Sequence, residues 1–205
     1  MHILSIYRDL LGLIDGTLFL LAAALFLLGI FFAPIVVKKQ IRPLLWYPLW
    51  IWGVIKRYAD PATPFFRLWA LIFSLNALSL FCNLVSGLSI MLPPLFSFLL
   101  GVHIAVICLK ELGRLGLLSL ILNPVSLLEL PAAWISLSLG MSLGKQLYLN
   151  GYANVLYLFR NGVMVYLLIV LPLLALSGLI EVALIKALGN GAMTSSGLSG
   201  ESRRE

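Results

Sequence analysis

Charged residues are scarce in this chain of 205 amino acids. Only 11% of the residues are Asp, Glu, Lys or Arg, whereas 61% are hydrophobic. Soluble domains carry roughly 25% charged and about 45–50% apolar residues, because much of their surface faces water. The composition therefore excludes an ordinary soluble domain and indicates a protein that is surrounded by a lipid bilayer.

Motifs of reactive and metal-binding residues are also missing. The two cysteines, Cys82 and Cys108, lie inside apolar segments, and no Cys/His group has metal-ligand spacing. We therefore predict no metal, no cofactor and no catalytic residue. The N-terminus lacks the features of a cleavable signal peptide, so none is expected. The net charge of +6 comes from short basic runs between apolar segments, which indicates contact with membrane lipids and no nucleic-acid partner.

The apolar runs predict an all-α fold, a polytopic membrane bundle formed by a single domain over residues 1–188. About five transmembrane helices of bilayer-crossing length are expected, at about 11–33, 66–92, 94–110, 126–144 and 163–188, and Pro34 is expected to end the first of them. Trp and Tyr flanked by Lys and Arg predict an interfacial helix over about 43–58, with a helix buried in the bundle as the alternative. A broken or re-entrant segment is predicted near 112–131, and a disordered tail over 189–205.

One carboxylate lies deep in the apolar sequence. Glu129 is flanked by two prolines in the segment NPVSLLELPA, which covers residues 123–132. An acid inside a membrane is costly, so Glu129 is expected to have a partner or a function. Asn123 and Ser126 are the two candidate N-caps for the helix that carries it. Small residues follow at every fourth position and favour close helix packing in lipid; they are Ala132, Ser136, Gly140 and Gly144.

The second predicted span has a polar face. Asn76 and Asn83 recur at helical spacing with Ser79 and Ser86. A polar face on a membrane-spanning helix is expected to point into the bundle. There it either bonds to neighbouring helices or lines a path for a solute.

Other polar and small residues are scattered over the remaining spans. Gly101 belongs to another row of small residues in the third span. His103 is expected to be a packing residue, with a proton-relay or ligand role as the alternative. Asp15 is expected at the interface, with a paired intramembrane acid as the alternative. Glu181 and Lys186, near the end of the last span, are also expected at the interface.

The basic residues predict the orientation of the bundle. With five crossings and the 34–66 connection inside, eleven of the 14 Lys and Arg residues are inside and three are outside. Cytoplasmic segments carry the excess of basic residues, so the N-terminus is expected outside and the C-terminus inside. A sixth crossing within residues 112–122 would weaken the bias to ten against four, and is less favoured.

The segment around Glu129 resembles a known family of membrane proteins. Residues 124–132, which end in Glu-Leu-Pro-Ala and are followed by Gly140 and Gly144, look like the signature of the stage II sporulation protein M family. The second span with Asn76 and the third span with Gly101 are similar to that family's pattern too.

This resemblance covers about residues 10–188 and has one departure. Many members carry Pro-His-Gly where this chain has Pro124, Val125 and Ser126, so a role for that histidine does not carry over. The resemblance implies an integral protein of a prokaryotic cell membrane. Its sporulation members act as scaffolds in a peptidoglycan-remodelling complex with cell-wall hydrolases, and relatives also occur in organisms that do not sporulate, archaea among them.

Two functions follow from these observations. The first is a non-enzymatic scaffold or assembly component of a membrane complex, with other membrane proteins or further copies of the chain as partners. The alternative is a transporter or channel component, in which Glu129, Asn76, Asn83 and His103 line a polar interior. An intramembrane enzyme is not expected, because Glu129 and His103 alone do not make a catalytic set.

Overall fold

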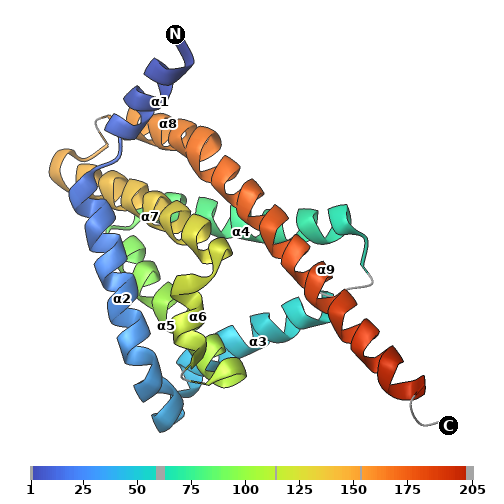
Figure 1. Ribbon diagram of the computed structural model, residues 1–205. Helices are drawn as coiled ribbons and strands as arrows, with labels where there is room; N and C mark the ends of the chain where they lie inside the picture. Colours follow the sequence, from blue (N-terminus) through green and yellow to red (C-terminus); the bar gives the residue numbers. More distant parts are fainter. Residues whose placement is uncertain (1, 59–62, 114, 153, 202–205) are drawn as a thin grey trace.

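The computed structural model describes residues 2–58, 63–113, 115–152 and 154–201, and within these residues it contains helices and no strand (Figure 1). Five of the helical segments are long and apolar enough to cross a membrane. The predicted all-α polytopic membrane bundle is therefore confirmed.

The first half of the described chain holds α1 (His2–Gly12), α2 (Gly16–Lys39), α3 (Arg42–Tyr58), α4 (Phe65–Val85) and the short 3-10 helix η1 (Ser86–Leu88). The second half holds α5 (Leu92–Leu112), α6 (Leu115–Leu122), α7 (Pro124–Asn150), α8 (Val155–Val165), the π-helical turn η2 (Tyr166–Val170) and α9 (Leu171–Glu201). The membrane-capable segments are α2, α4 with η1, α5, α7 and the α8–η2–α9 rod from Val155 to Ala187.

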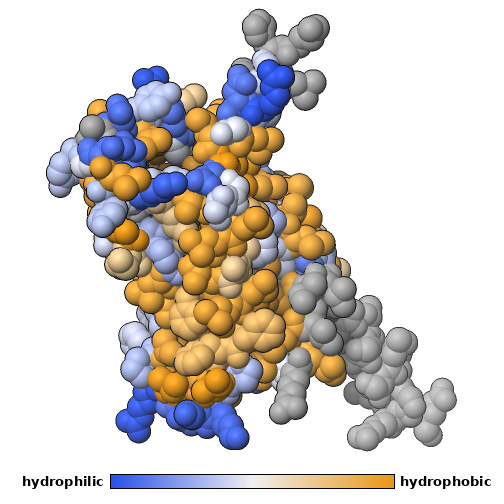
Figure 2. Space-filling view, turned by 90° about the vertical axis from the view of Figure 1, so that its left-hand side faces the viewer, coloured by the Kyte–Doolittle hydropathy of each residue, from blue (hydrophilic) through white to orange (hydrophobic). Residues whose placement is uncertain are grey.

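The bundle has two ends, which we name from their positions in Figure 1. The upper end holds α1, the start of α2, the end of α7 and α8, and the lower end holds the end of α2, the start of α3 and the end of α5. Figure 2 shows hydrophobic residues over the middle of one face, with hydrophilic residues gathered toward its top and bottom. This distribution is typical of a protein whose middle faces lipid and whose ends face water.

The first span is displaced relative to the predicted 11–33. It begins at Gly16, because Asp15 caps α2: its Oδ1 accepts hydrogen bonds from the backbone N–H of Thr17 (2.9 Å) and of Leu18 (3.2 Å). Pro34 was expected to end the helix, but it removes only one backbone donor and α2 continues to Lys39. The apolar residues before Asp15 form α1 instead.

The predicted break near 112–131 is present as two turns that flank α6. Gly113 ends α5 with φ +66° and ψ −156°, a combination that glycine adopts without strain because it has no Cβ. Helix α6 has eight residues and is about 12 Å long, which is too short for a crossing of its own. Asn123 Oδ1 then accepts a hydrogen bond from the N–H of Val125 (3.1 Å), so that Asn123 caps α7 as predicted.

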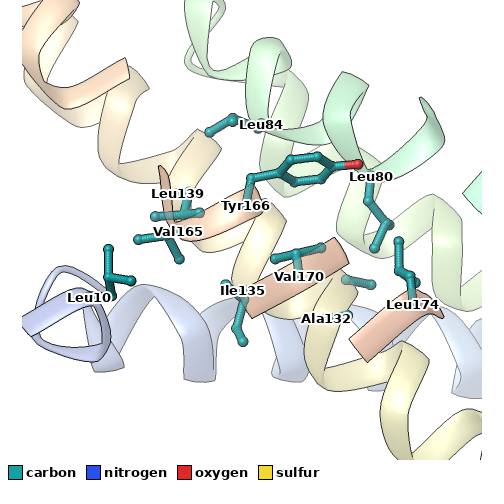
Figure 3. Close-up of a cluster of buried hydrophobic side chains, with 11 residues drawn as sticks. Leu10, Leu80, Leu84, Ala132, Ile135, Leu139, Val165, Tyr166, Val170 and Leu174 are labelled. Atoms are coloured by element: carbon teal, nitrogen blue, oxygen red, sulfur yellow. The ribbon is translucent and has the colours of Figure 1, made fainter. Parts of the chain in front are cut away.

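Helix α7 is the centre of the bundle. In its most apolar window 61% of the residues are buried, against 22–33% for the other four spans. One core cluster brings side chains of α7, α4 and the α8–η2–α9 rod together with Leu10 of α1 (Figure 3). Two further clusters pack α2 on α5 and α2 on α7. Small residues suit α7 to this position, because they let several helices approach it at once.

Helix α3 lies at the lower end, and it is not among the helices long enough to cross a membrane. Leu45 and Pro48 are buried, with Leu45 packed against α2 and α5, whereas Trp46 and Trp50 are exposed. One covered face and one open aromatic face match the predicted interfacial helix better than the alternative of a helix buried in the bundle.

The predicted disordered tail covers residues 189–205. Helix α9 extends to Glu201, while the side chains from residue 188 onward and the whole of 202–205 lie outside the described residues. Disorder of this tail stays a prediction.

Candidate functional site

Glu129 joins three helices at one point inside the bundle. Its Oε1 accepts a hydrogen bond from Asn76 Nδ2 of α4 (2.8 Å) and lies 3.2 Å from Ser177 Oγ of α9, whose single hydroxyl proton is shared between this oxygen and the backbone carbonyl of Leu174 (3.1 Å). Glu129 and Asn76 are partly buried, and Ser177 is fully buried. We call these three residues the polar junction. Buried polar groups need such partners, since an unpaired one costs free energy in an apolar medium.

The sequence around each member explains how the junction is assembled. The cap at Asn123 starts α7, and Glu129 follows on the side of α7 that faces α4 and α9. On the last rod, Pro172 lacks the N–H that would bond to the carbonyl of Leu168, and η2 is a π-helical turn immediately before it. The π-turn shifts the face of the rod by a fraction of a turn, and Ser177 follows on the shifted face.

Backbone carbonyls of α4 accept further hydrogen bonds beside the junction. Tyr166, in the π-turn, donates its hydroxyl proton to the carbonyl of Ala77, and Ser136 of α7 donates to the carbonyl of Leu80. Both carbonyls lie within one helical turn of Asn76. The polar groups of this region therefore hold α4, α7 and α9 together, in addition to the apolar cluster beside them (Figure 3).

The sequence reasoning missed Ser177. Glu181, whose expected position at the interface stays a prediction, lies one turn after Ser177 and is partly buried. The signal was present, because the two residues are four positions apart in an apolar span and so share one helix face. Lys186, in contrast, donates a hydrogen bond to the backbone carbonyl of Thr63, which precedes α4.

Asn83 and His103 do not belong to the polar junction. Asn83 is buried seven residues further along α4, about 10 Å from Asn76 along the helix axis, and its backbone faces α7 at Gly140. His103 of α5 is partly buried, and its ring centroid lies 5.0 Å from that of Tyr47 of α3. The four residues that were considered as one polar interior thus lie in three separate places.

Asp15 marks a second polar contact, at the upper end. Besides capping α2, its carboxylate lies 3.7 Å from Lys145 Nζ near the end of α7. Asp15 is partly exposed, and Lys145 is more so. This ion pair ties the start of α2 to α7, and its exposure at the upper end agrees with the expected position at the interface.

The small residues lie where helices touch. Ala132 and Ser136 are fully buried on α7. A Cβ added to Gly140 would lie 2.5 Å from the carbonyl oxygen of Asn83, and one added to Gly144 would lie 3.2 Å from the carbonyl oxygen of Gly87 in η1. At Gly101 of α5 the added atom would lie 2.0 Å from the carbonyl oxygen of Phe26 in α2.

The chemistry available at the polar junction is hydrogen bonding by one carboxyl group, one amide and one hydroxyl. Within the described residues, no three His, Cys, Asp or Glu side chains are grouped so that they could hold a metal ion. The arrangement can lock three helices in one register. A second carboxyl group, that of Glu181, is partly buried one helical turn beyond Ser177 on α9.

Comparison with known proteins gives one match. The family model described as stage II sporulation protein M matches residues 22–184. No curated protein and no solved structure matches the chain. The matched residues include all five membrane-capable segments in whole or large part, and every residue of the polar junction.

Proposed function

Because the chain belongs to the stage II sporulation protein M family, we propose that it is a non-enzymatic scaffold, an assembly component of a complex in the cell membrane. The chain is a membrane protein with five membrane-capable helical segments. In this proposal it crosses the cell membrane five times, and its partners are other membrane proteins or further copies of itself.

The polar junction is the observation that carries the proposal. Glu129, the acid that most needed an explanation, is bonded to Asn76 of α4 and Ser177 of α9. Interhelical hydrogen bonds of this kind are worth about 0.6–2 kcal/mol each in membranes. A carboxyl group that fixes the packing of three helices is what a rigid scaffold requires. Asn83 and His103 lie elsewhere, so the described residues do not join the four polar candidates into one path.

The basic residues support an orientation for this scaffold. Lys38 and Lys39 end α2 and Arg42 begins α3, so they belong to the lower end, and Lys56 joins them through its ion pair with Glu111 at the end of α5. Lys145, near the end of α7, and Arg160, in α8, belong to the upper end. The excess of positive charge favours the cytoplasm for the lower end. The N-terminus is then outside and the C-terminus inside.

The test compares Glu129→Gln with a matched control, Glu111→Gln. Glu111 is another glutamate with a well-defined partner, Lys56, but it lies at the lower end. Partners are captured by cross-linking and purification from the native membrane, and ion or solute flux is measured with purified protein in liposomes. A scaffold gives specific partners for the wild type, weaker capture or lower stability for Glu129→Gln, and no flux for any form.

A second candidate, a transporter or channel component, is favoured by one specific feature. Glu181 is partly buried one helical turn from Ser177, whose hydroxyl lies 3.2 Å from Glu129, and carboxyl groups inside a membrane bundle often mark ion and proton pathways. This candidate predicts wild-type flux in liposomes that is lost in both Glu129→Gln and Glu181→Gln while both variants remain folded. Such a result, with Glu111→Gln unaffected, would overturn the scaffold proposal.

A further inference from the structure

An exposed stripe of arginine and tryptophan runs along α3. Arg42, Trp46, Trp50, Gly53 and Arg57 follow one another at helical spacing, and all five are exposed. Trp46 is 68% and Trp50 53% exposed, and their rings stack with centroids 6.1 Å apart and an interplanar angle of 11°. A Cβ added to Gly53 would meet no atom within 4 Å, so the stripe is open along its length. We call these five residues the α3 stripe.

The rest of α3 fixes the direction in which the α3 stripe faces. Leu45 and Pro48 are buried on the other side of the helix, with Leu45 packed among residues of α2 and α5. Near the C-terminal end of α3, Lys56 forms an ion pair with Glu111 at the end of α5, and its ammonium lies 5.3 Å from the ring centroid of Trp52. The helix is therefore held at both ends, and the stripe must face away from the bundle.

The charge around the α3 stripe is mostly positive, and Glu111, the acid that the structure places near it, is paired with Lys56. From residue 16 to residue 59 the sequence contains no Asp or Glu. Lys38 and Lys39, just before α3, are exposed as well. Neither Arg42 nor Arg57 forms an ion pair with an acidic side chain of the described residues. The stripe thus presents two unpaired guanidinium groups, 15 residues and about 22 Å apart along the helix, with two aromatic rings between them.

We propose that the α3 stripe binds anionic phospholipids at the membrane surface. Tryptophan favours the headgroup level, where its ring is half in contact with acyl chains, and guanidinium binds phosphate oxygens with two parallel hydrogen bonds. Helix α3 is too short and too polar at its ends to cross, and it turns away from the end of α2 instead of continuing along it (Figure 1). An anionic lipid layer complements both the charge and the aromatic content of the stripe. The proposal does not depend on whether the protein is a scaffold or a transporter.

The test uses the full chain in phosphatidylcholine vesicles and the fluorescence of its tryptophans. Brominated phosphatidylglycerol or brominated phosphatidylcholine, at equal mole fraction, serves as the quencher. A basic residue near an anionic surface contributes roughly a fivefold preference, so the double variant Arg42→Gln/Arg57→Gln is expected to lose about 25-fold in relative affinity for phosphatidylglycerol. Wild type should be quenched more strongly by the anionic lipid, and high salt should reduce the difference.

Three further variants make the result specific to the α3 stripe. Arg42→Lys/Arg57→Lys keeps the charge and should keep the preference. Trp46→Leu/Trp50→Leu should remove most of the lipid-dependent quenching, since these are the most exposed indoles among the described tryptophans. Arg160→Gln, an exposed cation at the upper end, should leave the preference unchanged.

Equal quenching of the wild type by the two lipids would overturn the proposal and would favour a protein partner for the stripe. The proposal would also be overturned if Arg42→Gln/Arg57→Gln kept the full preference for phosphatidylglycerol, or if Arg160→Gln lost as much of this preference as that double variant. Circular dichroism and size-exclusion elution establish that each variant is folded. If Arg42→Gln/Arg57→Gln is not folded, Arg57→Gln alone is measured, and its relative affinity for phosphatidylglycerol is expected to fall about fivefold.

Discussion

Replacing Gly101 by alanine is expected to break the contact between α2 and α5. An added Cβ would lie 2.0 Å from the carbonyl oxygen of Phe26, whereas ordinary contacts begin at 3.4 Å, so this oxygen would have to retreat by about 1.4 Å. It belongs to a helix backbone and cannot rotate away. The reverse contact is equally close, because a Cβ on Gly29 would lie 2.2 Å from the carbonyl oxygen of Phe98. The two helices would have to separate along their shared surface.

Overpacking of this kind typically lowers the free energy of unfolding by about 1–3 kcal/mol. Because α2 and α5 also touch closely at Gly29, they have little room to adjust, and we expect Gly101→Ala to lower it by about 3 kcal/mol. The matched control is Gly53→Ala on α3, where an added Cβ meets no atom within 4 Å. Alanine is the better helix former by about 0.5–1 kcal/mol, so this variant should be as stable as the wild type or slightly more stable. Equilibrium unfolding in mixed micelles containing a denaturing detergent gives the free energy of unfolding of both variants. If Gly101→Ala unfolds at the same detergent fraction as Gly53→Ala, the close packing of α2 on α5 is refuted.

Three further predictions concern the cap of α2, the polar junction and the orientation of the bundle. Asp15→Ala should lower the free energy of unfolding by about 0.5–2 kcal/mol, and Asp15→Asn, which keeps the capping oxygen, should lower it less; equal losses would contradict a capping role. Asn76→Leu removes a donor to Glu129 and should cost about 1–3 kcal/mol in the same unfolding assay, whereas a neutral result would show that Glu129 is satisfied in another way. In cells, a cysteine at position 160 should react with a membrane-impermeant maleimide from outside and one at position 39 should not; the opposite pattern would reverse the orientation.

Much of the architecture could be predicted from local sequence. Long apolar runs gave the five spans, and the aromatic-basic composition of residues 43–58 gave a helix that does not cross. The errors were at boundaries. Asp15 delays the start of α2, and Pro34 lies inside the helix although it was expected to end it. A proline removes one backbone hydrogen bond of the helix. In an apolar surrounding, losing the remaining hydrogen bonds as well would cost much more, so the helix continues past the proline.

The polar junction could be predicted only in part. The cost of an intramembrane acid indicated that Glu129 needs a partner. Asn76 was a candidate partner, because it lies on the polar face of a membrane-spanning helix and that face was expected to point into the bundle. Ser177 was not found, because its spacing of four residues from Glu181 indicates a shared helix face but not that this face lies beside α7. Asn83 and His103 looked equally suitable in the sequence, yet they lie against Gly140 and Tyr47 instead.

The sequence by itself determined that lipid surrounds the protein, that the fold is helical and that Glu129 needs a hydrogen-bond partner. It could do so because hydrophobic free energy and backbone hydrogen bonding in lipid depend on composition and on the length of the apolar runs. Only the tertiary structure decided which helices meet. Residues 53 and 48 positions apart from Glu129 come into hydrogen-bond distance because glycine and other small side chains let α4, α7 and α9 approach closely. That choice of neighbours is a property of helix packing, in which many surfaces compete, and no local stretch of the chain encodes it.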